Sequence, residues 1–174
     1  MNPISIVKRK LAVFNEVKYA RDIGVRIGDN CRIISTPNWG SEPWLIEIGN
    51  HVEITTDVSF ITHDGSTWCF RDNKKYKDVI RYGSIIIDDN CFIGQSVIIL
   101  PNTHIGNNCI IGAGSVVKGR IPDNSVFAGV PARLICSTEV FAEKCLLENP
   151  HYSVEDYKAN KKKVVLEITH NKQK

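Results

Sequence analysis

The chain has 174 residues, 43% hydrophobic and 24% charged, which fits a globular domain and excludes a disordered or collagen-like chain. The net charge is +3, and its excess lies at the C-terminal end, because residues 158–174 hold six lysines and one glutamate and carry +5. The rest of the chain therefore carries −2. A body of that sign is a poor electrostatic partner for nucleic acid. No run of 18 apolar residues is present, so no membrane span is predicted.

The first segment predicts a helix. Residues 3–20 place apolar side chains at a spacing of three to four residues, which is typical of an amphipathic helix. Charges interrupt the apolar residues, so the segment is not a secretory signal. The six cysteines form no CxxC motif, and a reduced, cytoplasmic setting is the simpler interpretation. We expect an N-terminal helical cap over residues 1–24.

A six-residue repeat organises the middle of the chain. A period of six fits neither an amphipathic helix nor an alternating strand. It fits a short strand and a tight corner, repeated so that every third hexad returns above the first, with the aliphatic side chain inside and Gly or Asn at positive-φ corners. Residues 25–136 are therefore predicted to form an all-β solenoid. The uninterrupted series is Ile87, Ile93, Ile99, Ile105, Ile111 and Val117.

Three cysteines follow the same repeat. Cys31, Cys91 and Cys109 each lie four residues after an aliphatic position, where a small side chain fits inside the coil. We interpret them as packing residues. Because no paired histidine spacing accompanies the cysteines, no metal site is expected.

Two insertions interrupt the repeat, near residues 35–45 and 64–84. Both are rich in aromatic and polar residues. Insertions in a solenoid tend to lie on one edge and to carry function, so we expect the functional site beside them.

The end of the chain predicts further helices. Ser137 and Thr138 can cap a helix over about 139–148 that ends before Pro150. Ser153 and Asp156 then begin a second, basic helix. Residues 137–174 are thus expected to form a C-terminal helical extension.

The segments IGDNCRI, IEIGNHVEITTDVSFITHDGS and IGAGSVVKGRIPDNSVFAGVPARLI resemble the hexapeptide-repeat acyltransferases. The resemblance covers about residues 22–136, and its closest groups are the galactoside/maltose and the capsule/lipopolysaccharide O-acetyltransferases. It implies a left-handed parallel β-helix and a homotrimer with active sites shared between protomers. It also implies acetyl-CoA as donor and a sugar hydroxyl as acceptor, within cell-surface polysaccharide biosynthesis.

The resemblance implies that His63, in the motif FITHDG, acts as general base. The repeat points to the same residue, because His63 lies three positions after the interior Phe60, near a corner and beside the longer insertion. A hydroxyl is barely ionised at neutral pH, so its attack on a thioester needs such a base within hydrogen-bond reach. Asp64 is a candidate helper that orients His63 if the chain bends at Gly65.

For acetyl-CoA, the resemblance implies contacts with the pantetheine arm from Gln95, Ala113 and Gly114. It also implies phosphate contacts from Arg133, with Lys118 or Arg120 as a further candidate. The chain reads Lys118-Gly119-Arg120 where relatives usually have Thr-Lys-Asp, so the contacting lysine is displaced by one position.

The acceptor, a free sugar or a sugar-nucleotide or polysaccharide precursor, is expected to contact the insertions. Trp39, Trp44, Trp68, Phe70 and Arg71 are the candidates, because aromatic faces suit the apolar faces of sugar rings. For Trp39 and Trp44, packing of the insertion against the coil is an equal alternative.

Other functions remain open at this point. The acceptor could be an amino group on a nucleotide-linked sugar, or the chain could be a non-catalytic trimeric scaffold. A γ-type carbonic anhydrase would need two zinc-binding histidines five residues apart, and the five histidines here have no such pair. His51 is interpreted as structural and His104 as a weak contact candidate.

Overall fold

The computed structural model describes residues 16–171. Most of the predicted helix over 3–20, and of the predicted cap over 1–24, therefore lies outside the described residues, and residues 16–22 are helical. The chain divides into two compact units, of which the first ends at Glu139 and the second begins at Val140. The predicted division at residue 137 stays a prediction.

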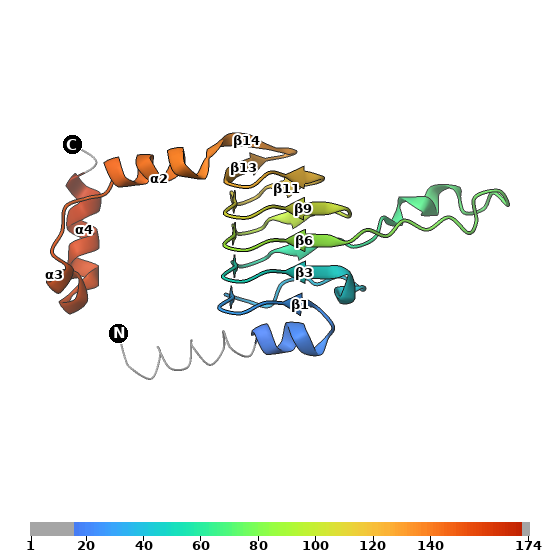
Figure 1. The fold of residues 1–174 in the computed structure, drawn as a ribbon, viewed down its shortest axis with the longest axis horizontal. Coiled ribbons are helices and arrows are strands. Elements are labelled where there is room, and N and C mark those ends of the chain that lie inside the picture. Colours follow the sequence, from blue (N-terminus) through green and yellow to red (C-terminus); the bar gives the residue numbers. More distant parts are fainter. Residues whose placement is uncertain (1–15, 172–174) are drawn as a thin grey trace. The chain divides into compact units, whose positions relative to one another are not determined.

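The first unit is built from three sheets that the chain visits in turn (Figure 1). Neighbouring strands are parallel, except for the antiparallel pair β13 and β14. The first sheet contains β1 (Arg26–Ile27), β3 (Ile46–Ile48), β6 (Ile85–Ile87), β9 (Thr103–Ile105) and β12 (Arg120–Ile121). The second contains β2 (Arg32–Ile33), β4 (Glu53–Ile54), β7 (Phe92–Ile93), β10 (Ile110–Ile111), β13 (Ser125–Gly129) and β14 (Ala132–Ser137). The third contains β5 (Ser59–Phe60), β8 (Ile98–Ile99) and β11 (Val116–Val117).

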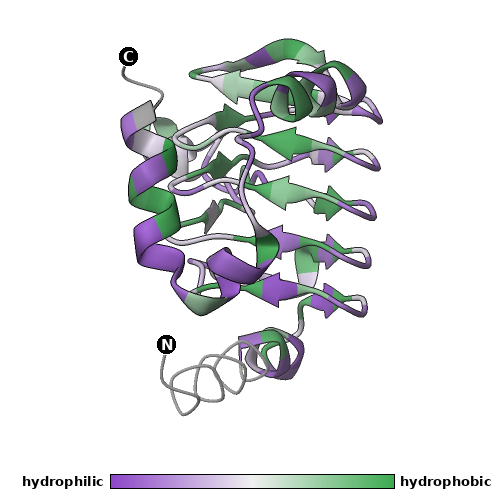
Figure 2. Cartoon of the chain, turned by 90° about the vertical axis from the view of Figure 1, so that its left-hand side faces the viewer, coloured by the Kyte–Doolittle hydropathy of each residue, from purple (hydrophilic) through white to green (hydrophobic). Residues whose placement is uncertain are grey.

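The interior of this stack is filled by the aliphatic residue of each hexad. Parallel register places these side chains directly above one another, for example Ile48, Ile87 and Ile105 in the first sheet. Figure 2 shows hydrophobic residues on strands throughout the stack, and burial alternates along them, as in β6, where Ile85 and Ile87 are buried and Ile86 is partly exposed. Each buried side chain of this size contributes about 1.5–3 kcal/mol relative to exposure. All members of the predicted series are at most 1% exposed: Ile87, Ile93, Ile99, Ile105, Ile111 and Val117.

The two cysteines in the middle of the stack are also interior. Cys91 and Cys109 are buried. Their sulfur atoms lie 3.1 Å from the carbonyl oxygens of Gly106 and Pro122 in the next coil. This geometry agrees with a packing role. Among the described residues, no group of three His, Cys, Asp or Glu side chains could hold a metal ion.

The glycines that follow the interior aliphatic residues allow neighbouring coils to approach each other closely. A Cβ added to Gly94 would lie 2.6 Å from the backbone nitrogen of Ala113 and 2.7 Å from the carbonyl oxygen of Ile111. Gly94 does not have a positive φ. The expectation that such glycines occupy left-handed corners is therefore wrong at this position: the missing side chain gives room for the neighbouring coil.

The left-handed corners between the first and second sheets belong instead to four asparagines and one histidine. Their φ angles lie between 55° and 59°. The asparagine amides form a ladder, with Asn90 Nδ2 donating to Asn108 Oδ1 at 2.7 Å and Asn108 Nδ2 donating to Asn124 Oδ1 at 2.9 Å. His51 joins this ladder through Nδ1, 2.7 Å from Asn90 Oδ1, which supports a structural role. The five residues are Asn30, His51, Asn90, Asn108 and Asn124.

We predict that His51→Asn leaves the protein as stable as the parent or raises its free energy of unfolding by about 0.5 kcal/mol. Asparagine adopts the left-handed conformation more readily than histidine, and its amide can take the same place in the ladder. Urea unfolding followed by circular dichroism measures the change. A loss of more than about 1 kcal/mol would show that the imidazole has a role that an amide cannot fill.

The insertions leave the stack on one side. The first contains the short 3₁₀ helix η1 (Pro43–Leu45). The second, residues 64–84, forms an arm that projects from the coils between β5 and β6 (green in Figure 1). The arm begins with the 3₁₀ helix η2 (Gly65–Phe70), whose N-cap is Asp64.

The described C-terminal segment contains α2 (Thr138–Leu147), α3 (Val154–Ala159) and α4 (Lys161–Asn171). Where the sequence predicts a single basic helix after Ser153, the structure has two, α3 and α4, which are separated at Asn160. Ser153 caps α3 by accepting a hydrogen bond from the backbone nitrogen of Asp156, as its sequence position indicates. In the described part of the chain, every helix is too short or too polar to cross a bilayer.

Candidate active site

His63 lies where the chain leaves the solenoid for the arm. It is the third residue after β5. Its backbone forms an isolated antiparallel bridge with Tyr82, where the arm returns. The side chain is about half exposed, so a ligand can reach the imidazole.

A carboxylate from the first insertion holds His63. Oε2 of Glu42 lies 3.0 Å from Nδ1 of His63 and accepts a 2.6 Å hydrogen bond from the hydroxyl of Thr62. The bond from Thr62 and, after it, the bond with His63 lower the pKa of Glu42. The side chain, 14% exposed, is therefore charged at neutral pH. Because a carboxylate can only accept, Nδ1 carries the imidazole proton and Nε2 keeps the lone pair that a base needs.

Asp64, the predicted helper, has other partners. Its carboxylate pairs with Arg81 at 2.8 Å and accepts a 2.9 Å hydrogen bond from the backbone nitrogen of Ser66. Hydrogen bonds from Ser66, followed by the charges of Arg81 and Lys118, lower the pKa of Asp64. The backbone of Asp64 is extended and its side chain caps η2. Because neighbouring side chains in an extended chain point apart, Asp64 does not contact the imidazole of His63. This geometry argues against Asp64, and for Glu42, as the group that orients His63.

Three cavities meet at His63. The His63 cleft, of about 680 Å³, is also lined by Arg81, Leu100 and Lys118. The arm pocket, of about 330 Å³, is lined by His63 together with Trp68 and Arg71. A third hollow, of about 410 Å³, borders the first insertion and contains His63. The imidazole thus stands between hollows formed by the two insertions, with room for more than one ligand.

The predicted cofactor residues separate into groups. Lys118 follows β11 and lines the His63 cleft. Gln95, Ala113 and Gly114 lie at the corner between the second and third sheets, where the backbone nitrogen of Gly114 donates to the carbonyl of Gln95 at 2.7 Å. His63 lies at the other end of the third-sheet strands, so one chain does not bring this corner to its own His63.

The two predicted arginines lie elsewhere on the stack. Arg120 is on β12, in register with His104 of β9, and His104 itself pairs with Asp88 at 2.8 Å. Arg133 is on β14 and donates to the carbonyl of Ala132 at 3.1 Å. Neither arginine lines a cavity that contains His63.

The aromatic candidates have different surroundings. Trp39 is 5% exposed and stacks on Phe60 in the core, with ring centroids 4.9 Å apart, which argues against the predicted contact with the acceptor and for the packing alternative. Trp44 is exposed beside Gly24 and lines none of the three cavities. Trp68, 78% exposed, does line the arm pocket with Arg71.

Sequence reasoning missed Glu42 and Arg81. The sequence feature that could have pointed to Glu42 is its position, because it is an acidic residue inside the first insertion. Its partner His63 is 21 residues away, so only the return of the coil brings the two together. Arg81 lies where the arm returns to the stack, and its backbone is paired with the start of the arm, since its carbonyl accepts from the backbone nitrogen of Asp64 at 2.9 Å.

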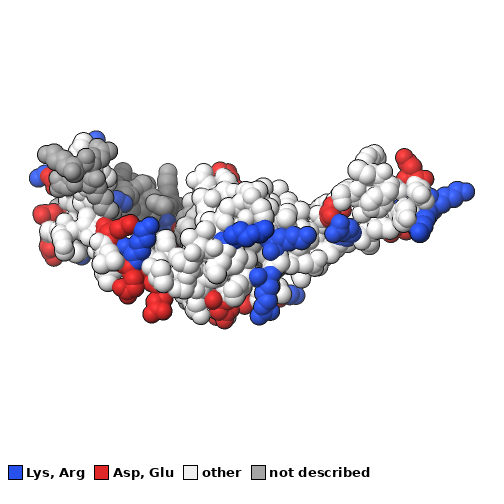
Figure 3. Space-filling view, turned by 90° about the horizontal axis from the view of Figure 1, so that it is seen from above, with Lys and Arg blue, Asp and Glu red and all other residues white. Residues whose placement is uncertain are grey.

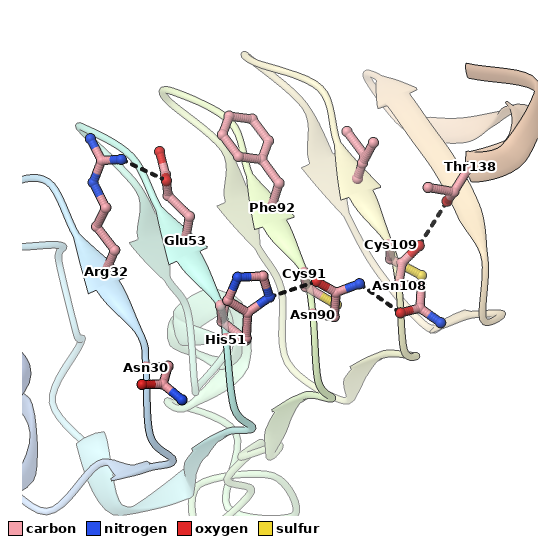
Figure 4. A pocket seen from close by; sticks show the side chains of 12 residues that line it. Asn30, Arg32, His51, Glu53, Asn90, Cys91, Phe92, Asn108, Cys109 and Thr138 are labelled. Atoms are coloured by element: carbon pink, nitrogen blue, oxygen red, sulfur yellow. Dashed lines mark hydrogen bonds and ion pairs between the residues drawn. The ribbon is translucent and has the colours of Figure 1, made fainter. Parts of the chain in front are cut away.

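A fourth hollow, of about 490 Å³, lies along the asparagine ladder, away from the insertions (Figure 4). The amides of Asn90 and Asn108 and the ring of His51 bind one another there. Arg32 pairs with Glu53 at 3.2 Å. These five side chains thus bind one another, whereas His63 is about half exposed among the three cavities beside the insertions.

Comparison with known proteins agrees with this location of the repeat. Residues 84–119 match the family described as bacterial transferase hexapeptide (six repeats). The chain is 47% identical over 148 residues to Protein CapG of Staphylococcus aureus, and the match covers 84% of each chain. It is 32% identical over 96 residues to the putative lipopolysaccharide biosynthesis O-acetyl transferase WbbJ of Escherichia coli strain K12, which covers 52% of this chain and 49% of WbbJ. The chain thus spans about half the length of that relative.

A solved structure gives a similar fold. The hexapeptide-repeat containing acetyltransferase from Vibrio cholerae superposes with a TM-score of 0.53 at 18% identity. The match covers 75% of this chain and 92% of that chain. At this identity, the likeness concerns the fold alone.

Proposed function

Since the chain belongs to the family of hexapeptide-repeat acetyltransferases, we propose that it transfers an acetyl group from acetyl-CoA to a sugar hydroxyl, with His63 as general base. The observation that carries this proposal is the hydrogen bond between His63 Nδ1 and the charged Glu42. The name of WbbJ, a lipopolysaccharide O-acetyl transferase, supports oxygen as the acceptor atom and cell-surface polysaccharide synthesis as the setting. We propose a cytoplasmic reaction, because the proposed donor, acetyl-CoA, is a metabolite of the cytoplasm.

In the proposed reaction, Nε2 of His63 accepts the proton of the sugar hydroxyl as its oxygen attacks the thioester carbonyl. The imidazolium formed in this step is stabilised by the carboxylate of Glu42, 3.0 Å from Nδ1. When the C–S bond breaks, Nε2 returns the same proton to the leaving sulfur. The products are an acetyl ester and CoA with a free thiol, so protons and electrons balance. A base of this kind contributes about 10²–10⁴-fold.

We predict that Glu42→Gln lowers kcat by about 10–100-fold, because a hydrogen bond to a charged group contributes about 1.5–3 kcal/mol. The KM for acetyl-CoA should change little, since Glu42 acts through His63. Steady-state assays of CoA thiol release measure both values. Glu42→Asp should recover part of the loss, because it keeps the charge.

The same variant has a pH signature. Folding lowers the pKa of Glu42, so its contribution to stability is complete above the ordinary carboxyl value of about 4 and is lost as pH falls through the lowered value. The difference in free energy of unfolding between the parent and Glu42→Gln should therefore shrink on acidification.

Glu47→Gln, which alters an exposed pair with Arg26, is the matched control for the activity measurement and should keep full activity. Equal kcat in the parent and Glu42→Gln would contradict the role of Glu42.

The function is tested with a panel of hydroxyl and amino sugars, acetyl-CoA and mass spectrometry of the products. We expect acetyl esters, which mild alkali removes. Products acetylated only on amines would replace the proposal by N-acetyl transfer to an amino sugar. Failure to bind any acyl-CoA would favour a non-catalytic scaffold.

We propose further that the coil is left-handed and the active protein a homotrimer, as in the family. The corner with Gln95, Ala113 and Gly114 lies away from His63 of the same chain, and a neighbouring copy can bring such a corner to the imidazole. Light scattering should give about three times 19.5 kDa. A fully active monomer would contradict this assembly.

A further inference from the structure

The wall of the arm pocket carries more positive than negative charge. Its charged residues are Asp64, Arg71 and Arg81. Asp64 and Arg81 form an ion pair at 2.8 Å. Arg71 donates to the neutral hydroxyl of Thr67 at 3.2 Å, and the pocket offers it no second carboxylate. A guanidinium is thus available beside His63.

The neighbouring His63 cleft adds a third cation, Lys118, to the same Asp64 and Arg81. Lys and Arg side chains continue along the arm with fewer Asp side chains among them, and Figure 3 shows both kinds of charge on the projecting part of the molecule. Two sides of the imidazole therefore favour a negatively charged ligand.

The phosphates of acetyl-CoA do not account for the arginines. The reacting thioester carbonyl must meet the acceptor oxygen at Nε2 of His63, and the long pantetheine chain separates that carbonyl from the phosphates of CoA. A phosphate held beside the imidazole in the arm pocket therefore belongs to the other substrate.

We infer that the acceptor sugar carries a phosphate group close to the hydroxyl that is acetylated; this rests on the proposed function. Arg71 and Arg81 bind the phosphate, because a guanidinium presents a planar fork of donors that matches its oxygens. Asp64 offsets one of the three charges of Arg71, Arg81 and Lys118, and the two positive charges that remain match a phosphate or diphosphate better than the single charge of a carboxylate. Trp68, with 78% of its surface exposed in the same pocket, provides an apolar face for the sugar ring or for a base attached to the phosphate.

The test compares forms of one sugar as acceptors: the methyl glycoside, the 1-phosphate, the nucleoside diphosphate conjugate, the farnesyl diphosphate conjugate and the uronic acid. Glucose, galactose and N-acetylglucosamine serve as the sugars. We expect kcat/KM to be at least about 10-fold higher for a phosphorylated form than for the methyl glycoside. A preference for the nucleotide conjugate or for the farnesyl conjugate identifies the source of the phosphate, and either result supports the inference.

Arg71→Gln should lower kcat/KM by about 10–100-fold for the phosphorylated acceptor, a larger loss than for the methyl glycoside. Arg26→Gln, at an exposed position on β1, is the matched control and should change neither value. Equal rates with the methyl glycoside and the phosphorylated forms, or a preference for the uronic acid, would overturn the inference while the acetyl transfer stands. Acetylation of no sugar in the panel would overturn the proposed function and the inference with it.

Discussion

His63→Ala is expected to lower kcat for acetyl transfer by about 10²–10⁴-fold, the contribution of a positioned general base. The side chain is about half exposed and Nε2 faces no partner among the described residues that would hold the fold together. The loss should therefore fall on the chemical step, with stability retained. Release of the CoA thiol, followed with a saturating acceptor, measures kcat.

The control for this variant is His51→Asn, which changes another histidine of the stack that the asparagine ladder holds away from the cavities at His63. It should keep the activity of the parent. Retention of more than about a tenth of kcat in His63→Ala would contradict the assignment of the base. Thermal unfolding of both variants checks that any loss of activity is not a loss of fold.

Phe60→Ala is expected to lower the free energy of unfolding by about 3–5 kcal/mol, the usual cost of truncating a buried phenylalanine. Phe60 is fully buried, and its ring stacks on Trp39 with an interplanar angle of 18°. Removing the ring leaves a cavity between the third sheet and the first insertion. Urea unfolding followed by tryptophan fluorescence measures the change.

Phe60→Ala should also lower the activity, because Phe60 is three residues from His63. The first insertion, which contacts Phe60 through Trp39, also carries Glu42. Phe92→Ala is the matched control: Phe92 is about two-fifths exposed on the outer face of β7, and its truncation should cost less than half as much. A loss below about 1.5 kcal/mol in Phe60→Ala would mean that the insertion closes over the gap.

The parallel coil was predictable because its cause is local and repeated. An interior aliphatic residue every six positions, with small residues between, has few other ways to bury its apolar side chains. What the repeat did not reveal is why the glycines follow the aliphatic residues. Gly94 is required because the backbone of Ala113 in the next coil lies too close for a side chain. The six residues around Gly94 do not indicate this contact, since it depends on the neighbouring coil.

The candidate site was predictable in part. His63 could be found because it combines a motif with a place beside an insertion. Its partner could not be found in the same way, since Asp64, adjacent in sequence, is turned to Arg81 and Ser66. Trp39 could not be assigned from the sequence either. An aromatic residue in an insertion gives the same sequence pattern whether it faces a ligand or, as here, packs on Phe60.

The sequence by itself determined the period of the coil, the interior side chains and the position of the imidazole, because each depends on residues within a few positions of one another. The tertiary structure decided which carboxylate orients the imidazole and which cations surround it. Glu42, Arg81 and Lys118 reach His63 from three different segments of the chain. Their meeting depends on how two irregular insertions return to the stack, and the hydrophobic repeat that fixes the coils does not extend into those insertions.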